Sequence, residues 1–468
     1  MKKGLLTKAA AIALSATLTV TALAGCGNKK SDRDENGKII VSVGEWPTKG
    51  PGVQNLADRK QQFEADNPEF TIVPDEWTFE LKSFYAKAAG GSLPTIYRAF
   101  FTEMSQIISA GYAADMTETM KKHDILDKFN EQILDVVSND GKVYAFPFSA
   151  YALGLGCNID LMQQAGLVEA DGTPKQPKDW EELREFAVKI KEATGKPGFV
   201  FPSSNNYGGW MFTPLAWSYG VEFMKKDGDK WKATFDTPEA VAALQYVKDL
   251  KWKYDVLPTN SLIDGTEYYK IFGTNNAGII LAADSFANSI KQYDFDMSNV
   301  GMMAMPKGPK KHVTLLGGGV YAVSGDSTEE QIDGALKWTE LSYTPFMSDK
   351  FKETLKKNVD KNIADGLPVG ILGLNIWKDD IETSKYRDEF IEQNANINLN
   401  HVKLYNEFVK DMGDCELKPE EPMCAQQLYA ILDGCIQEVL TNKDADCEEL
   451  IKKANSDFQV NYLDNADY

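Results

Sequence analysis

Strands and amphipathic helices alternate along the first hundred residues after the N-terminal segment, and this alternation limits the fold more than any other feature. Hydrophobic runs over 39–43, 70–73 and 95–101 predict strands, and the residues between them, 56–65 and 81–89, predict helices. Such alternation is typical of βαβ units and of a mostly parallel sheet. The chain is therefore predicted to be an α/β protein.

The same signals continue further along the chain, whose length indicates two lobes. Residues 179–191 and 238–254 carry apolar side chains at helical spacing, while 278–283 reads as a buried strand. Asp227-Gly228 predicts a hairpin turn, and the last hundred residues favour helices. The residues from Ile39 to Tyr468 are too many for one ordinary core, so we expect two α/β lobes.

The N-terminal segment has the composition of an export signal. A basic start with three lysines is followed by an apolar stretch over 9–24, which ends in Leu-Ala-Gly-Cys at Cys26. The stretch is shorter than the ~20 apolar residues of a membrane-spanning helix. Leu-Ala-Gly-Cys resembles the lipobox of bacterial lipoproteins, which implies a signal peptide over 1–25 and a lipid on Cys26; the alternative is a cleaved signal with an unmodified Cys. The polar composition that follows predicts a flexible tether over 26–38.

Charge and cysteine content argue against several classes of function. The formal net charge is −19, and removing a signal with three lysines and no acids makes it −22, which disfavours binding to nucleic acid or to an anionic membrane surface. The five cysteines after Cys26 lack a Cys-x-x-Cys pair and nearby histidines, which disfavours a zinc site. We expect free thiols and no cofactor, with one disulfide left open within Cys415, Cys424, Cys435 and Cys447.

Several short blocks stand in the order found in one known family. The blocks are FEADNP at 63–68, GKVYAFP at 141–147, NIDL at 158–161, AGL at 165–167, PKDWEEL at 177–183 and three glycines at 317–319. Together they resemble the extracellular solute-binding protein family of ABC importers, in the branch that mostly binds carbohydrates. Thr95 stands where that family usually has Asp, Cys157 where it has Tyr, and Asp284-Ser285 where many sugar binders have Trp. These departures concern the ligand more than the fold.

The resemblance implies a type II periplasmic-binding-protein-like fold, in which two hinged lobes close on a ligand in a central cleft. The lobes are assigned as 39–149 plus about 315–355 for lobe 1, and 150–314 plus about 356–468 for lobe 2. The chain is expected to cross between the lobes near 147–152, near 312–316, and a third time between 347 and 360.

Candidate binding residues follow the predicted strand ends and hinge strands, because ligands of open α/β sheets lie outside the carboxyl ends of strands. A sugar presents an apolar C–H face and a rim of hydroxyls, so its site needs aromatic rings beside hydrogen-bonding groups. These rules select Glu45, Trp46, Tyr97, Arg98, Tyr151, Asn206, Tyr207, Trp210, Asp284, Ser285, Gly318 and Trp377. Asn206, Tyr207 and Trp210 belong to a predicted cleft loop. Arg98 has the alternative role of a structural ion pair, and Asp284 that of a helix cap.

We predict a lipid-anchored solute-binding protein that captures a carbohydrate, an oligosaccharide in particular, and delivers it to the permease and ATPase of an ABC importer. Hydrolase motifs and phosphate-binding loops are lacking, and three histidines leave few general bases, so no enzyme activity is expected. The alternatives are the same fold with a peptide or an anion as ligand, and an anchored glycoside hydrolase, which needs only two carboxylates. We expect a monomer on the extracellular face of the cell membrane, with a Gram-positive surface favoured over a Gram-negative periplasm.

Overall fold

The structure, a computed structural model, describes residues 32–228 and 230–466. Its strands are β1 (Ile39–Val43), β2 (Phe70–Pro74), β3 (Ile96–Phe100), β4 (Ser138–Asn139), β5 (Lys142–Val143), β6 (Ala145–Ala152), β7 (Gly154–Asn158), β8 (Met224–Asp227), β9 (Lys230–Ala233), β10 (Ile279–Ala282), β11 (Val300–Met303), β12 (Val313–Val323) and β13 (Glu416–Pro419). Within the described residues, one six-stranded sheet has the order β13-β12-β3-β1-β2, with β6 paired to β12, and a three-stranded sheet has the order β10-β7-β11.

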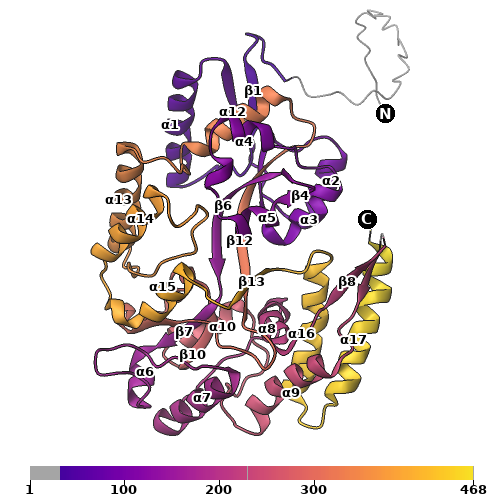
Figure 1. Cartoon of the computed structure of the whole chain (residues 1–468), viewed down its shortest axis with the longest axis vertical. Helices are drawn as coiled ribbons and strands as arrows, with labels where there is room; N and C mark the ends of the chain where they lie inside the picture. Colours follow the sequence, from indigo (N-terminus) through magenta and orange to yellow (C-terminus); the bar gives the residue numbers. More distant parts are fainter. Residues whose placement is uncertain (1–31, 229, 467–468) are drawn as a thin grey trace, which may run out of the picture. The chain divides into compact units, whose positions relative to one another are not determined.

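Helices make up most of the remaining regular structure (Figure 1). They are α1 (Pro51–Asp66), α2 (Leu81–Ala89), α3 (Phe101–Ser109), α4 (Thr117–Lys122), α5 (Glu131–Val136), α6 (Ile159–Gln164), α7 (Trp180–Thr194), α8 (Tyr207–Tyr219), α9 (Pro238–Trp252), α10 (Gly265–Gly273), α11 (Ala287–Ile290), α12 (Glu329–Glu340), α13 (Asp349–Ala364), α14 (Glu382–Gln393), α15 (Lys403–Lys410), α16 (Ala425–Thr441) and α17 (Cys447–Asn461). In the described part of the chain, no helix is long and apolar enough to cross a bilayer.

The first βαβ unit forms where the alternation predicts it. β1 alternates buried and half-buried residues and pairs in parallel with β2, with Ile39 opposite Phe70. The ring of Phe63 on α1 lies 5.9 Å from that of Phe70, which anchors the helix on the sheet. Burying a side chain of this size contributes roughly 1.5–3 kcal/mol, so the apolar face of the helix fixes its position.

The second sheet lies among helices that the sequence also predicts. α7 begins after Asp179, whose carboxylate accepts the amide N–H of Glu182 at 2.9 Å, and it ends at Gly195 with a positive φ of 71°. Its apolar stripe is buried: Trp180, Leu183, Phe186, Ala187 and Ile190. The predicted hairpin at Asp227-Gly228 is confirmed by the antiparallel pair β8–β9.

The expectation of a mostly parallel sheet holds for the first three strands, because β1 pairs in parallel with both β2 and β3, but the later strands depart from it. β12 pairs antiparallel with both β3 and β6, and the three-stranded sheet is antiparallel throughout. The cause is the long strand β12, which runs beside β6 in the opposite direction over most of its length (Figure 1). Leu153 alone separates β6 from β7, so the chain passes from one sheet to the other close to the first predicted crossing.

Two further expectations about the ends of the folded part need correction. Residues 32–38, assigned to the tether, fold onto β1, because Asp34 accepts the amide of Lys38 at 2.9 Å and the hydroxyl of Thr71 at 3.0 Å. Residues 416–419, assigned to lobe 2, form β13 and extend the six-stranded sheet beside β12. The signal peptide and Cys26 lie outside the described residues.

The cysteines that the structure describes are free thiols, as expected. They are Cys157, Cys415, Cys424, Cys435 and Cys447, and all but Cys424 are buried. Burial raises the pKa of the Cys157 thiol strongly and that of Cys415 to about 12, so these thiols stay protonated and behave as apolar core groups.

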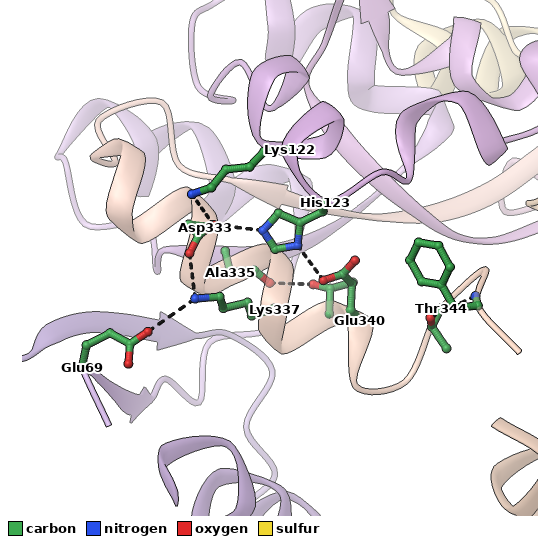
Figure 2. A network of polar contacts seen from close by, with 10 residues as sticks. Glu69, Lys122, His123, Asp333, Ala335, Lys337, Glu340 and Thr344 are labelled. Carbon is green, nitrogen blue, oxygen red and sulfur yellow. Dashed lines mark hydrogen bonds and ion pairs between the residues drawn. The ribbon is translucent and has the colours of Figure 1, made fainter. Parts of the chain in front are cut away.

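A histidine joins α4 to α12 through two carboxylates (Figure 2). The His123 ring contacts Glu340 through Nδ1 at 2.8 Å and Asp333 through Nε2 at 2.9 Å. Two carboxylate acceptors require a proton on both ring nitrogens, and the hydrogen bond to Glu340 raises the pKa of His123 above its ordinary value. Lys337 bonds the other oxygen of Asp333 at 2.9 Å, so the acidic pair is balanced by cations.

This arrangement predicts that His123 stabilises the protein mainly at mildly acidic pH. Because its folded pKa exceeds the unfolded value near 6.5, the stabilisation is complete below about pH 6.5 and is lost as the pH rises through the folded pKa. His123→Ala is expected to lower the free energy of unfolding by about 1–2 kcal/mol at pH 6 and by less at pH 9, measured by urea unfolding.

His401 provides a control whose contribution to stability should depend on pH in the opposite direction, because burial lowers its pKa. His401→Ala should cost more at pH 9 than at pH 6. An equal cost of His123→Ala at both pH values would contradict the doubly bonded imidazolium.

Candidate functional site

A cavity of about 390 Å³ is lined by residues from five parts of the fold. β3 and the start of α3 supply Phe100 and Glu103, while β6 supplies Phe148 and Tyr151. The remaining walls come from the glycines of β12, from the first turn of α8, and from Glu420 and α16. We call this cavity the central pocket. Its position at strand and helix ends is the one expected for a ligand site.

Glycines on β12 create the space for the aromatic wall of the central pocket. A Cβ atom added to Gly317 would lie 2.1 Å from Cζ of Tyr151, and one added to Gly319 would lie 2.5 Å from Cζ of Phe148. A Cβ atom added to Gly318 would likewise lie 2.4 Å from Cε2 of Phe101. Gly318 is one of the predicted ligand contacts. In the structure the three glycines line the pocket and also make room for rings on neighbouring elements.

The first turn of α8 is held in place by α16, which packs beside it (Figure 1). Asp433 accepts the amide N–H of Asn206 at 2.6 Å and that of Gly209 at 2.7 Å, so one carboxylate caps the helix N-terminus. The backbones approach so closely that a Cβ on Gly209 would lie 2.2 Å from the carbonyl oxygen of Tyr429. This contact fixes the direction in which Tyr207 and Trp210 project.

The prediction of a cleft loop is wrong for Tyr207 and Trp210, which stand in the first turn of the helix Tyr207–Tyr219, whereas Asn206 precedes that helix. Two glycines and Pro214 lower the helix propensity of this segment, so the start of the helix is not predicted from the sequence. The Pro214 nitrogen cannot donate to the Trp210 carbonyl, and the hydroxyl of Thr213 donates to that carbonyl instead, at 2.8 Å. Burial on nearly all sides then stabilises the helix.

Glu420 connects the two sides of the central pocket. Trp210 Nε1 donates to Glu420 Oε1 at 2.5 Å, and the hydroxyl of Thr102 donates to Oε2. Burial raises the pKa of the Glu420 carboxyl, while contacts with Thr102, Trp210 and Tyr429 oppose the rise. Trp210 is therefore fixed as a ring in the pocket wall with its N–H satisfied.

Glu103 is a second buried carboxyl in the same wall. Its residue is only 6% exposed, and burial together with the charge of Glu420 raises its pKa to about 8. Within the described residues its Oε2 atom has no hydrogen-bond partner. Glu103 also borders a cavity of about 710 Å³ between α3 and α16, whereas Asn205 borders a cavity of about 380 Å³ beside α10.

Arg98 is the cation among the described residues that line the central pocket, and it is already engaged. Its Nη1 atom lies 2.8 Å from Glu45 Oε2, and its guanidinium stacks on Phe148 at 4.7 Å from the ring centroid. Glu45 therefore contacts the site through Arg98. This is the structural ion pair predicted as the alternative role of Arg98. The φ of Glu45 is 58°.

Six of the predicted site residues line the central pocket: Arg98, Tyr151, Asn206, Tyr207, Trp210 and Gly318. Among the others, Trp46 stacks on Trp338 at 6.1 Å between ring centroids, and Ser285 is exposed. Asp284 borders Gly373, and burial raises the pKa of its carboxyl.

Two predicted aromatic contacts belong to the core. The hydroxyl of Tyr97 donates to the Tyr112 carbonyl at 2.9 Å, and the side chain is 1% exposed. Trp377 packs on Phe129 with 4.1 Å between ring centroids. Tyr97 is one of the predicted ligand contacts near a strand end, whereas the structure places it inside β3, where both Ile96 and Tyr97 are buried.

Several lining residues escaped the sequence analysis: Phe100, Thr102, Glu103, Phe148, Ser149, Glu420, Gln426 and Tyr429. Glu103 and Glu420 follow β3 and β13 closely, so the strand-end rule could have found them. Gln426 and Tyr429 lie on α16, more than 200 residues from α8, and no local sequence pattern predicts that these two helices pack together. Among the residues described, no group of three or more His, Cys, Asp or Glu could hold a metal ion.

Comparisons with known proteins agree with this architecture. The family model described as bacterial extracellular solute-binding protein matches residues 44–345. A binding protein of Brucella abortus (strain 2308) is 26% identical over 302 residues, which cover 63% of this chain and 68% of the relative. The sn-glycerol-3-phosphate-binding periplasmic protein of Escherichia coli (strain K12) is 25% identical over 333 residues, covering 66% and 72% of the two chains.

A solved structure extends the likeness to nearly the whole chain. The cyclic alpha-maltosyl-1,6-maltose binding protein from Arthrobacter globiformis superposes with a TM-score of 0.65 and 21% identity, covering 90% of this chain and 98% of that chain. This likeness shows a shared fold, the type II periplasmic-binding-protein fold that the sequence predicts.

Proposed function

Because the chain belongs to the bacterial extracellular solute-binding protein family, we propose that it captures an oligosaccharide and delivers it to the permease of an ABC importer. The family is extracellular and non-catalytic, so the prediction of a binding protein rather than an enzyme is confirmed. The alternative of an anchored glycoside hydrolase is dropped for the same reason.

The aromatic wall of the central pocket carries the proposal. Phe100 is 51% exposed, and Phe148, Tyr151, Tyr207 and Trp210 line the remaining wall. Such rings stack on the apolar C–H faces of sugars, and neighbouring carboxyl and amide groups accept or donate hydrogen bonds to hydroxyls. The two adjoining cavities give room for more than one sugar unit.

An anion is the second candidate ligand. The name of the Escherichia coli relative states that it binds sn-glycerol-3-phosphate, and Arg98 lines the central pocket here. However, Arg98 is paired with Glu45, and two buried glutamates share the same pocket. A phosphate would meet two carboxyl groups and no unpaired cation among the described lining residues, so the saccharide is the better candidate.

The anchor and the lobes complete the proposal. Cys26 carries a lipid that holds the protein at the outer face of the membrane. The fold divides into the lobes assigned from the sequence, except that residues 32–38 pack on β1, β13 joins the six-stranded sheet and the first crossing lies at Leu153. Replacing Cys26 by Ser is expected to release the protein from the membrane fraction into the medium. Retention of the Cys26→Ser protein at the membrane would contradict the anchor.

A thermal-shift screen tests the ligand class directly. Oligosaccharides, single sugars, short peptides and sn-glycerol-3-phosphate are each added to the purified protein, because a ligand that binds only the folded state raises the unfolding midpoint. At a concentration of 100 times Kd the stabilisation is about 2.7 kcal/mol. We expect an oligosaccharide to give the largest shift; a shift with peptide or glycerol-3-phosphate alone would overturn the proposal.

Trp210→Ala is predicted to weaken saccharide binding at least about tenfold, since a central aromatic ring in an interface commonly contributes 2 kcal/mol or more. The substitution removes a ring of the wall and the donor to Glu420 Oε1. Calorimetric titration with the best saccharide measures the effect. Trp252→Ala, a half-exposed tryptophan on α9 away from the pocket, is the matched control and should bind normally. Equal affinity of the two variants would show that the pocket is misplaced.

A further inference from the structure

The buried carboxyl of Glu103 has an oxygen atom without a hydrogen-bond donor among the described residues. Its residue is 94% buried, it lines the central pocket and the larger adjoining cavity, and its Oε2 atom has no hydrogen-bond partner in the described residues. Buried polar atoms are nearly always paired, so an orphaned carboxyl oxygen at a cavity wall indicates a group supplied by the ligand.

The charges of the neighbouring side chains indicate which chemical group of a ligand would bond Glu103. Glu420 lies in the same wall, and its two oxygens are already bonded by Thr102 and Trp210. Among the described residues that line the central pocket, Arg98 is the cation. Arg98 forms an ion pair with Glu45. The pocket therefore contains two carboxyl groups without a cation of their own.

The walls around these carboxyls are suited to a positive charge. Tyr151, Tyr207, Trp210 and Tyr429 present aromatic rings to the same cavity. Aromatic faces attract cations, and an ammonium group only donates hydrogen bonds, as two carboxylates require. A hydroxyl could donate to Oε2 of Glu103, but only a cation also favours the ionised form of the two carboxyls, whose pKa values burial raises.

We propose that Glu103 and Glu420 form a recognition site for a protonated amine, so that the captured saccharide carries at least one free amino group. This inference rests on the proposed function of saccharide capture, and it names the chemical class of the ligand. The pair then acts as a specificity determinant that favours an amino sugar over its hydroxyl counterpart and over a phosphate ester.

Matched pairs of sugars test this inference by calorimetric titration. The probes are glucosamine against glucose, galactosamine against galactose, and the β-1,4-linked glucosamine dimer against cellobiose and against the N-acetylated dimer. At least one amino sugar is expected to bind ten times or more tightly than its neutral partners. If every neutral partner binds as tightly as the amino sugar, or if only neutral saccharides bind, the inference fails while saccharide capture stands.

Variants assign the preference to the two carboxyls. Glu103→Gln and Glu420→Gln keep the side-chain shape and should each reduce the amino-to-neutral affinity ratio to near one. Glu416→Gln, an exposed glutamate of β13, is the control and should keep the ratio of the wild-type protein. A ratio unchanged in both pocket variants overturns the assignment. Absence of binding by any saccharide overturns the proposed function and this inference with it.

Discussion

Gly209→Ala is expected to lower the free energy of unfolding by about 3 kcal/mol, at the upper end of the usual cost of overpacking. The added Cβ would lie 2.2 Å from the Tyr429 carbonyl oxygen and 2.5 Å from its Cα atom. These are backbone atoms of α16, which cannot rotate away as a side chain could, so α8 and α16 must separate. The separation would also lengthen the bonds from Asp433 to the first turn of α8.

Urea unfolding measures the effect, and the same chain offers a matched control. Gly434 lies in the interior of α16, and an added Cβ there would meet no atom within 4 Å. Gly434→Ala should stabilise the protein by roughly 0.5–1 kcal/mol, because alanine loses less conformational freedom in a helix than glycine. If Gly209→Ala is as stable as the wild-type protein, the close backbone contact between the two helices is wrong.

Ligand binding provides a second measure of the same contact. Tyr207 and Trp210 both stand in the first turn of α8, with 5.3 Å between their ring centroids. A shift of this helix would move both rings and the partner of Glu420, so Gly209→Ala should weaken saccharide binding as well, whereas Gly434→Ala should leave it unchanged.

The order of elements could be predicted from the sequence because local patterns determine it. The alternation in the first hundred residues and the apolar stripe of α7 both depend on neighbours within a few positions, and the described structure contains these elements. The direction of pairing could not be predicted in the same way. β12 pairs with β6 from about 170 positions away, and strand hydrophobicity is compatible with either direction.

The candidate site was predicted where it follows strand ends and missed where it depends on long-range packing. Tyr151 on β6 and Arg98 on β3 could be found from their strands, although Arg98 also needed Glu45 to define its role. Tyr429 and Asp433 act across the interface of α8 and α16, which no short pattern reveals. Trp46 shows the converse, because a tryptophan after a strand is as suited to a core as to a cleft. Trp377, which lies between α13 and α14 rather than after a strand, also packs in the core.

Glu103→Gln is expected to stabilise the empty protein at alkaline pH by up to about 4 kcal/mol and to change little at pH 5. Burial and the neighbouring Glu420 raise the pKa of Glu103 from 4.5 to about 8. A carboxyl with a raised folded pKa contributes stability below its unfolded pKa and loses it as the pH rises through the folded value.

The window for this effect therefore runs from about pH 4.5 to above pH 8. Glutamine resembles the protonated acid and does not ionise, so the variant escapes the cost of a buried charge beside Glu420, Tyr85 and Tyr429. Urea unfolding of both proteins at pH 5, 7 and 9 gives the comparison, with Glu118→Gln as control because the Glu118 side chain is 85% exposed. Parallel pH profiles for the wild-type protein and Glu103→Gln would mean that Glu103 is solvated or paired, and the argument for a ligand amine at this carboxyl would lose its structural basis.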